Sequence, residues 1–312
     1  MIAAIVNPKS GGGKTGERWA AIQSALEREL GTFTVLETRQ KLDAIGLTRQ
    51  ALKDGTQTII AVGGDGTLNE VVNGFFEDGV PIHPAAKLAV VLRGTGSDFV
   101  KTCKLPGTIE ELTQAIKTGD ASPCDIVRAT VKPISEEPRE RYFINVADVG
   151  IGGPVVNLVN NSSKRLGGKI TFLLAGAQAT LQSKNFMMRI KLDGETICDQ
   201  QPRYFTVIAN GKYFGGGMHI APEANLNDGL FDVMLAGDFS LFEKIFKILP
   251  RLYTGKIGQL KKIRMLRGKR LHINADRPLL IEADGELIGK TDALFEILPS
   301  ALQIVGMNDK VD

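Results

Sequence analysis

The stretch AVGGDGTLNEVVNG, at residues 61–74, predicts a buried strand that turns through glycines directly into a helix. Gly63, Gly64 and Gly66 leave room for an anionic group close to the backbone. The N-terminus of the helix adds partial positive charge, so the turn suits the phosphates of a nucleotide. The Asp65 carboxylate is positioned to hold magnesium on those phosphates. The alternative is a plain turn in which Asp65 caps the helix.

Strand and helix patterns alternate around this turn through about the first 120 residues. Apolar runs predict strands, and apolar residues at helical spacing predict the helices between them. The order indicates a parallel sheet with helices on both faces, whose ligands bind beyond the carboxyl ends of the strands. The predicted strands are residues 2–6, 33–37, 57–62 and 87–92, and the predicted helices are residues 16–30, 43–55 and 67–78.

The pattern changes after about Asp120 to many short strands separated by turn residues, which favours a β-sandwich second domain. Three helices interrupt them, at residues 154–166, 169–182 and 240–255. The predicted strands are residues 124–133, 141–152, 186–192, 203–210, 229–236, 262–268, 270–274, 279–283 and 293–298.

The composition of the 312 residues restricts the class of protein. A net charge of +3 is too small to imply nucleic acid, but it suits an anionic ligand or membrane surface. The 4 Tyr and 1 Trp supply little stacking surface for bases, and three distant cysteines indicate reduced thiols in the cytoplasm. The N-terminus lacks a secretory pattern, and no run of 18 apolar residues predicts a membrane span, so any membrane contact is expected to be peripheral.

Two further glycine turns follow predicted strands in the first domain. NPKSGGGKTGER, at residues 7–18, is not a Walker A motif, because Pro8 stands five positions before Gly13 where that motif needs glycine. It can hold phosphate on its glycines, or be only a tight strand-to-helix turn. LRGTGSDF, at residues 92–99, brings Asp98, which is expected to face the same cleft as Asp65 or to cap a helix.

Two Asp-Gly turns in the second domain carry carboxylates. In LNDG, at residues 226–229, Asp228 and adjacent carbonyl oxygens suit a hard cation. In ADGE, at residues 283–286, Glu286 follows the turn. Spacing alone favours an ordinary hairpin turn at Asp228, and Glu286 is unremarkable in isolation.

Together these motifs resemble the diacylglycerol kinase catalytic-domain family, which includes soluble bacterial lipid kinases and the related sphingosine and ceramide kinases. GGDGT alone is shared with NAD kinases and phosphofructokinases, whereas the later motifs single out the lipid kinases. The motifs occur in the order of the family: NPKSGGGK, VGGDGTLNEVVNG, RGTGSDF, NVADVGIG, GGGMHIAPEANLNDGLFDV and ADGE.

The resemblance implies an NAD kinase/diacylglycerol kinase-like fold with ATP between a Rossmann-like domain, residues 1–123, and a β-sandwich lipid-substrate domain, residues 124–298. The tail, residues 299–312, would pack back on the first domain. Glu286 would be the general base, with Asp65 and Asp98 as catalytic carboxylates. A magnesium site would use Asp228 with backbone oxygens of Asn225 and Leu230. Nucleotide contacts would fall on Asn7, Pro8, Lys9, Ser10, Gly11, Thr38, Gly63, Gly64, Asp65, Gly66, Thr67, Leu68, Asn69 and Thr95.

The implied function is transfer of phosphate from ATP, with Mg2+, to a hydroxyl of a lipid such as diacylglycerol, in phospholipid biosynthesis. The enzyme would be cytoplasmic, touch a membrane surface peripherally and bind no nucleic acid; a homodimer is common in the family. Apolar residues near Phe172 would line an acyl groove or only a helix core, and Lys164 and Arg165 would touch headgroups or solvent. Ser97 replaces the usual Asn, which leaves substrate preference open.

Two alternatives remain for the function. One is a kinase for another acceptor, such as a ceramide or sphingosine lipid, phosphatidylglycerol or NAD. The other is a catalytically dead relative that binds lipid or nucleotide, against which the retention of Asp65, Asp98 and Glu286 argues.

Overall fold

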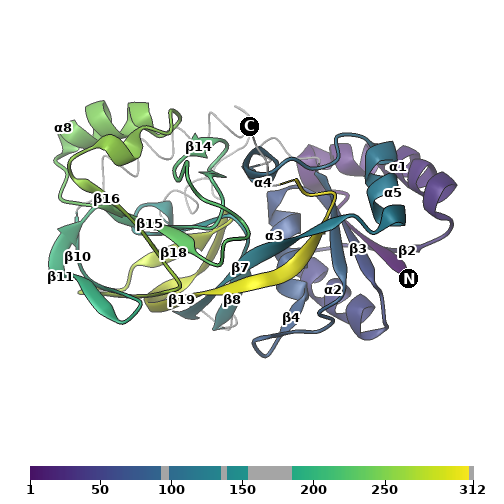
Figure 1. Ribbon diagram of the computed structural model, residues 1–312, viewed down its shortest axis with the longest axis horizontal. Helices are drawn as coiled ribbons and strands as arrows, with labels where there is room; N and C mark the ends of the chain where they lie inside the picture. The colour runs from purple at the N-terminus through teal and green to yellow at the C-terminus, as the bar shows by residue number, and fades with distance from the viewer. Residues whose placement is uncertain (93–97, 135–138, 154–184, 309–312) are drawn as a thin grey trace. The chain divides into compact units, whose positions relative to one another are not determined.

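The computed structural model in Figure 1 describes residues 1–92, 98–134, 139–153 and 185–308. The chain forms two compact units, which we call unit 1 (Met1–Asp125 with Pro299–Asp312) and unit 2 (Ile126–Leu298). Strands β7 (Ala121–Lys132) and β19 (Glu286–Val305) each run from one unit into the other. The chain therefore crosses between the units twice.

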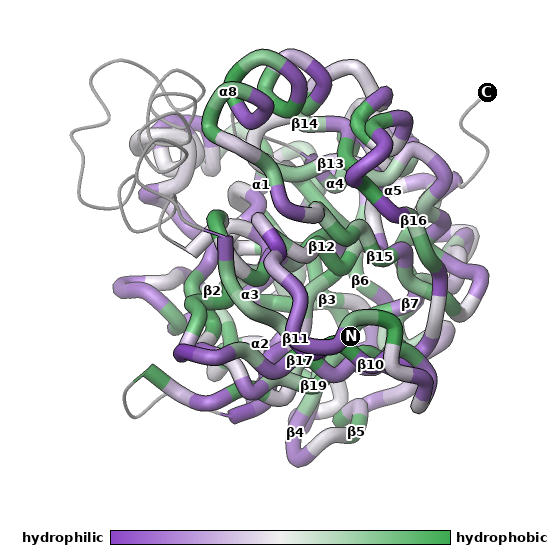
Figure 2. The backbone as a smooth tube through the Cα atoms, turned by 90° about the vertical axis from the view of Figure 1, so that its left-hand side faces the viewer, coloured by the Kyte–Doolittle hydropathy of each residue, from purple (hydrophilic) through white to green (hydrophobic). Residues whose placement is uncertain are grey.

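Unit 1 contains the parallel sheet that the sequence predicts. Its strands lie in the order β2 (Thr34–Glu37), β1 (Ile2–Val6), β3 (Thr58–Gly63) and β6 (Lys87–Leu92). Every pair is parallel, and the end of β19 adds a fifth parallel strand beside β6. The C-terminal segment thus completes the sheet of unit 1. Figure 2 shows β3 and β6 as strongly hydrophobic, in keeping with strands buried on both faces.

Five helices accompany this sheet: α1 (Lys14–Leu30), α2 (Asp43–Lys53), α3 (Asp65–Gly74), α4 (Asp98–Thr102) and α5 (Ile109–Thr118). On one face, Trp19, Ile22 and Leu26 of α1 join Leu112 and Ala115 of α5 in a core against the strands. Burying each large side chain contributes roughly 1.5–3 kcal/mol. Helices α2 and α3 pack on each other.

Helix α3 ends earlier than predicted, at Gly74 rather than near residue 78. A Cβ at Gly74 would lie 2.5 Å from Cβ of Thr48, so only glycine permits this close approach of α3 to α2. The following residues form β4 (Phe76–Glu77), which pairs with β5 (Val80–Pro81). Tertiary contact therefore overrides the helical pattern there.

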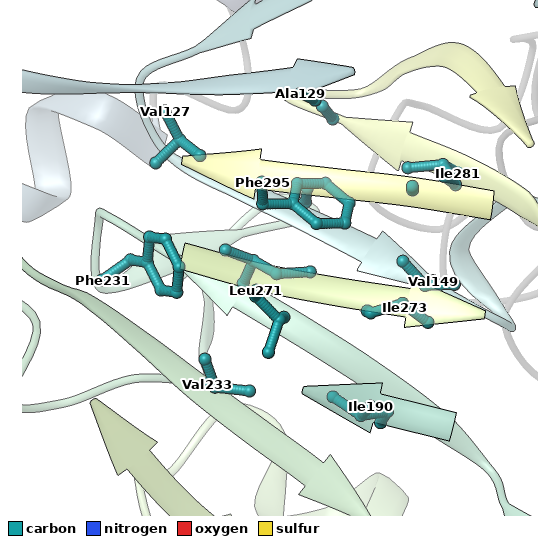
Figure 3. Packing of buried hydrophobic residues seen from close by; sticks show 14 of the residues in the cluster. Val127, Ala129, Val149, Ile190, Phe231, Val233, Leu271, Ile273, Ile281 and Phe295 are labelled. Atoms are coloured by element: carbon teal, nitrogen blue, oxygen red, sulfur yellow. The ribbon is translucent and has the colours of Figure 1, made fainter. Parts of the chain in front are cut away.

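Unit 2 is the predicted β domain. Antiparallel neighbours lie in the order β16-β15-β12-β9-β18-β19, while β10 pairs with β11 and β17, and β17 pairs with β19. Phe231, Leu271 and Phe295 lie in one hydrophobic core cluster of unit 2 (Figure 3). The Phe295 ring meets that of Phe143 edge to face. Its further strands are β8 (Glu140–Phe143), β9 (Val146–Val149), β10 (Phe186–Leu192), β11 (Glu195–Arg203), β12 (Phe205–Ala209), β13 (Tyr213–Phe214), β14 (Met218–His219), β15 (Phe231–Ala236), β16 (Ile263–Gly268), β17 (Arg270–Ala275) and β18 (Leu280–Ala283).

Two predicted elements of unit 2 differ in detail. The strand predicted at residues 141–152 is split into β8 and β9, because the amides of Ile144 and Asn145 donate to the Asp284 carboxylate instead of a strand ladder. The helix predicted at residues 240–255 is a short α8 (Leu241–Glu243), a π-helical turn (Lys244–Ile248) and a 3-10 turn (Leu249–Arg251). Strand β11 was not predicted, since its sequence ETICDQQPR is mostly polar.

The helices predicted at residues 154–166 and 169–182 lie outside the described residues. Among the residues that the structure does describe, no helix is both long and apolar enough to cross a membrane.

Candidate functional site

The N-terminal glycine loop lies at the carboxyl end of β1, beside the loop that follows β3. The backbone N–H of Asn7 donates to the Val62 carbonyl at 2.9 Å, and its side-chain amide donates to the Thr67 hydroxyl at 3.0 Å. Gly11, Gly12 and Gly13 have φ of 62°, 72° and 92°, conformations that favour glycine. Successive residues of this kind can form an anion-binding concavity of backbone amides. The two glycine loops thus share one edge of the sheet of unit 1.

The GGDGT turn makes the expected strand-to-helix transition. Gly64 is the N-cap of α3, no side chain caps the helix there, and Asp65 is its first residue. The alternative in which Asp65 caps the helix is therefore not what the geometry shows. A Cβ at Gly63 would lie 2.4 Å from the Thr67 hydroxyl oxygen, so the turn requires glycine at this position. Leu68 and Asn69, two of the predicted nucleotide contacts, are buried.

Asp98 lies at the start of α4, after the next strand of the sheet. Strands β3 and β6 are parallel neighbours, with Gly63 opposite Leu92, so the segments after them leave the same edge. Asp98 is 8% exposed and accepts a hydrogen bond from Nζ of Lys101 at 2.8 Å. Lys101 was not predicted as a site residue, although its spacing from Asp98 is that of a helical ion pair. Residues 93–97, including the predicted nucleotide contact Thr95, lie outside the described residues.

A cavity of about 820 Å³ adjoins the end of β2 in unit 1. Thr38, a predicted nucleotide contact, lines it, and its N–H donates to the Val6 carbonyl at the end of β1. Lys9 reaches the same region through a hydrogen bond from Nζ to the Arg39 carbonyl at 2.9 Å. The remaining lining residues are Val35, Leu36, Glu37, Arg39, Leu42, Asp43, Gly46 and Leu47.

The turn that carries Glu286 is anchored by its own aspartate. Asp284 and Gly285 have φ of 49° and 88°, the signature of a type I′ hairpin turn between β18 and β19. The Asp284 carboxylate accepts three backbone N–H bonds, from Ile144 at 2.9 Å, Asn145 at 3.0 Å and Val146 at 3.1 Å. The turn is therefore an ordinary hairpin whose backbone is held in place next to Glu286. The Glu286 residue itself is half-buried.

Two buried carboxyl groups lie beneath this turn, and neither was predicted. Asp148 of β9 and Glu282 of β18 are opposite each other across the antiparallel pair and are 1% and 3% exposed. Burial raises the pKa of Asp148 to about 7, although the Gly152 N–H favours its anion. Burial also raises the pKa of Glu282 well above its usual value, helped by the nearby Asp148, Asp284 and Glu286. The signal in the sequence was an acid inside an apolar strand, in VADV and LIEA.

The chain contains a second Asp-Gly-Glu turn, which shows what is special about the first. Asp193 and Gly194 have φ of 50° and 89° between β10 and β11, and the Asp193 carboxylate also accepts two backbone N–H bonds. Glu195, however, is exposed, and exposed Lys191 takes the place along the strand that buried Glu282 has in the first turn. The two turns share sequence and backbone and differ in their carboxylate surroundings.

The predicted metal residues lie in a loop before β15. Oδ1 of Asp228 accepts the Leu230 N–H at 3.0 Å, and its other oxygen is ion-paired with Arg267. Nε of Arg267 lies 3.6 Å from Oδ1 of the buried Asp232. The oxygen donors fit a hard cation chemically. The Arg267 guanidinium already offsets their charge, however, so a cation would compete with it for Asp228.

Comparison with known sequences and structures gives the class. Residues 1–129 match the family described as the diacylglycerol kinase catalytic domain, and residues 145–306 match the YegS C-terminal NAD kinase beta sandwich-like domain. A solved diacylglycerol kinase from Bacillus anthracis has a TM-score of 0.69 at 20% identity, covering 98% of this chain and 96% of that one. Yeast NADH kinase has a TM-score of 0.55 at 11% identity, covering 99% and 84%. Both structures share the predicted two-domain fold.

The chain belongs to the diacylglycerol kinase catalytic-domain family, with a YegS-type C-terminal domain. It is 28% identical over 308 residues to "Diacylglycerol kinase" of Staphylococcus aureus, which covers 99% of this chain and 93% of that protein. It is 29% identical over 281 residues to "Probable lipid kinase YegS-like" of Shewanella frigidimarina, covering 90% and 86%. The relatives are kinases, and the resemblance predicted from the sequence motifs is confirmed.

Proposed function

We propose that this chain transfers the γ-phosphoryl group of ATP to a hydroxyl group of a membrane lipid, with diacylglycerol as the acceptor. The observation that carries this proposal is the edge of the unit 1 sheet where two glycine loops meet, with the Asn7 side-chain amide donating to the Thr67 hydroxyl at 3.0 Å. Asp284 fixes Glu286 through three backbone hydrogen bonds, and Asp65 begins the helix after the GGDGT turn. The names of the curated relatives favour a lipid acceptor.

In unit 1, the backbone of residues 7–11 and 63–69 would hold the triphosphate, together with Thr95. The cavity that Thr38 lines is large enough for the nucleoside part. Asp65 and Asp98 offer the carboxylate oxygens that Mg2+ prefers. Magnesium, when bound, would offset the negative charge of the phosphates.

In unit 2, Glu286 would accept the proton of the attacking lipid hydroxyl as its oxygen bonds to the γ-phosphorus. The bond from that phosphorus to the β-phosphate oxygen breaks, and ADP leaves. Phosphoryl transfer depends mainly on positioning and charge neutralisation. The anchored Asp284 turn supports this role because it fixes the base without needing a ligand.

A second magnesium would be structural rather than reacting. Its ligands would be the Asp228 carboxylate and backbone oxygens of Asn225 and Leu230, with Arg267 turned away. Since the ion pair with Arg267 stands in its way, this site is expected to bind weakly.

The test is phosphate transfer from γ-labelled ATP with Mg2+ to a panel of acceptors. Diacylglycerol, ceramide, sphingosine and phosphatidylglycerol are each offered in vesicles, and NAD in solution. Label is expected in phosphatidic acid, with none for the Asp65→Ala variant. Label in phosphorylated NAD alone, or nucleotide binding without transfer to any lipid, would contradict the proposal.

A further inference from the structure

The helical segment after β15 exposes large apolar side chains. Phe242 and Phe246 are 66% and 60% exposed, and their rings pack only 4.5 Å apart, centroid to centroid. Leu241 and Tyr253 of the same segment are 46% and 48% exposed. Figure 2 shows much of the tube at α8 coloured as hydrophobic. A contiguous exposed patch of this kind usually marks a surface that binds something.

The opposite side of the same segment is buried against unit 2. Phe239, Ile248 and Ile257 are buried in a core cluster of unit 2. Lys244 is also buried, with Nζ 4.0 Å above the Tyr204 ring. The exposed phenylalanines are therefore not part of an incompletely packed core, because other residues of this segment make the core contacts.

The segment concentrates the positive charge of the chain. Residues 238–262 contain six Lys or Arg and two acidic residues, a net charge of +4, whereas the whole chain has +3. Of the acids, Glu243 is ion-paired with Lys247 at 3.0 Å and Lys262 at 2.7 Å. In the part of the chain that the structure describes, the side chains of Lys256 and Lys261 make no ion pair. Exposed aromatic and basic residues within one segment are typical of surfaces that lie on anionic membranes.

We propose that this docking face, formed by Leu241, Phe242, Phe246 and Tyr253 with the basic residues around them, is where unit 2 binds an anionic lipid bilayer. The aromatic rings enter the interface, and the lysines meet the lipid phosphates. This inference rests on the proposed function, because membrane docking would bring the enzyme to its lipid substrate. Membrane binding itself does not require phosphate transfer.

Hydrogen bonds connect the docking face with the Glu286 turn through unit 2. The Leu252 carbonyl accepts from the His219 N–H at 2.7 Å, and Gly255 has a φ of 68° against the His219 ring. The neighbouring Ile220 N–H donates to the Lys212 carbonyl at 3.0 Å. Two residues earlier, the Asn210 N–H donates to the Asn145 carbonyl at 2.8 Å.

The Asn145 N–H then donates to the Asp284 carboxylate at 3.0 Å, which completes this path. The face and the turn belong to one hydrogen-bonded framework.

Binding is tested by sedimentation with vesicles of phosphatidylcholine, with or without about 30 mol% phosphatidylglycerol, in the absence of ATP. Wild type should bind the anionic vesicles. Phe242→Ser/Phe246→Ser should weaken binding by roughly tenfold or more, since each ring contributes apolar burial. Lys256→Glu/Lys261→Glu should weaken it by roughly tenfold as well, with the greatest difference at low salt. Val80→Ser, which removes a side chain 60% exposed in unit 1, is the matched control and should bind as wild type does.

The same variants distinguish a lipid bilayer from a second copy of the chain as the partner of this face. If wild type does not sediment with anionic vesicles, or both double variants bind as well as wild type, the proposal is overturned. If the serine variant converts a wild-type dimer to a monomer in light scattering while vesicle binding persists, the face joins two copies of the chain, and the proposal is again overturned. Failure of phosphate transfer to every lipid, with vesicle binding that still depends on this face, would reject the proposed function alone.

Discussion

Replacing Asp148 by Asn tests the buried carboxyl pair beneath the Glu286 turn. Asn keeps an oxygen that can accept the Gly152 N–H, now 2.5 Å from Oδ1 of Asp148, and it removes the ionisable proton. The change leaves the packing of β9 against β18 nearly intact. Any effect on stability should therefore depend on pH.

The sign follows from the raised pKa of Asp148. Its carboxyl group has a usual pKa of 3.8, raised to about 7 by burial in the fold. Between these values the folded chain holds a proton that the unfolded chain has lost. The contribution of Asp148 to stability is therefore greatest below this window and falls as pH rises through it. One pKa unit corresponds to about 1.36 kcal/mol. The contribution of Asp148 to the unfolding free energy should therefore be about 3 kcal/mol smaller at pH 8 than at pH 5. Glu282, whose pKa is also raised, acts in the same direction.

The assay is urea unfolding of unit 2, followed at pH 5 and pH 8 for wild type, Asp148→Asn, Glu282→Gln and the double variant. Each single variant should lose less stability than wild type between the two pH values, and the pair should be non-additive because the carboxyl groups interact. Asp199→Asn, which changes an exposed carboxylate on β11, should follow wild type. A wild type equally stable at both pH values, or an Asp148→Asn variant with the full wild-type slope, would refute the assignment.

Three further predictions concern Asp65, Asp228 and Asp284. Asp65→Ala should abolish phosphate transfer with an unchanged melting temperature, measured at saturating ATP and Mg2+; near-normal turnover would reject Asp65 as a site residue. Asp228→Ala should remove any rise of melting temperature with Mg2+, whereas Arg267→Gln should enlarge it by releasing Asp228; equal shifts in all three proteins would show that no ion binds there. Asp284→Ala should lower the unfolding free energy of unit 2 by about 3 kcal/mol, because three backbone N–H groups lose a charged acceptor, with Asp284→Asn less affected; equal stability of the two variants would contradict this anchor.

In unit 1 the order β1, α1, β2, α2, β3, α3 and β6 was predictable because each of these elements carries its own apolar period, whereas α4, α5, β4 and β5 were not predicted. The end of α3 was not predictable, because it depends on the contact of Gly74 with Thr48, a residue of another helix 26 positions away in sequence. The break between β8 and β9 could not be predicted from the local sequence either. The residue responsible, Asp284, lies 139 positions from Asn145 along the chain.

The turn that carries Glu286 shows where sequence patterns stop being informative. Asp-Gly-Glu occurs at residues 193–195 and 284–286 with the same turn geometry, so neither local pattern nor backbone distinguishes them. The family motifs chose the second. The surroundings of the two turns differ, since Asp148 and Glu282 are buried near the second turn while Glu195 of the first is exposed. Burial depends on cross-strand partners, which a single sequence does not reveal.

The central claim, that Glu286 is the base of a phosphoryl transfer to lipid, is tested most directly by kcat of Glu286→Gln beside Glu195→Gln. The two variants make the same chemical change at two turns of matching sequence and backbone. The account predicts that Glu286→Gln lowers kcat at least about a hundredfold, at the low end of general-base effects, with ATP affinity and melting temperature little changed. Glu195→Gln should leave kcat at the wild-type value. A Glu286→Gln variant that retains more than about a tenth of wild-type kcat, well short of that effect, would contradict the account.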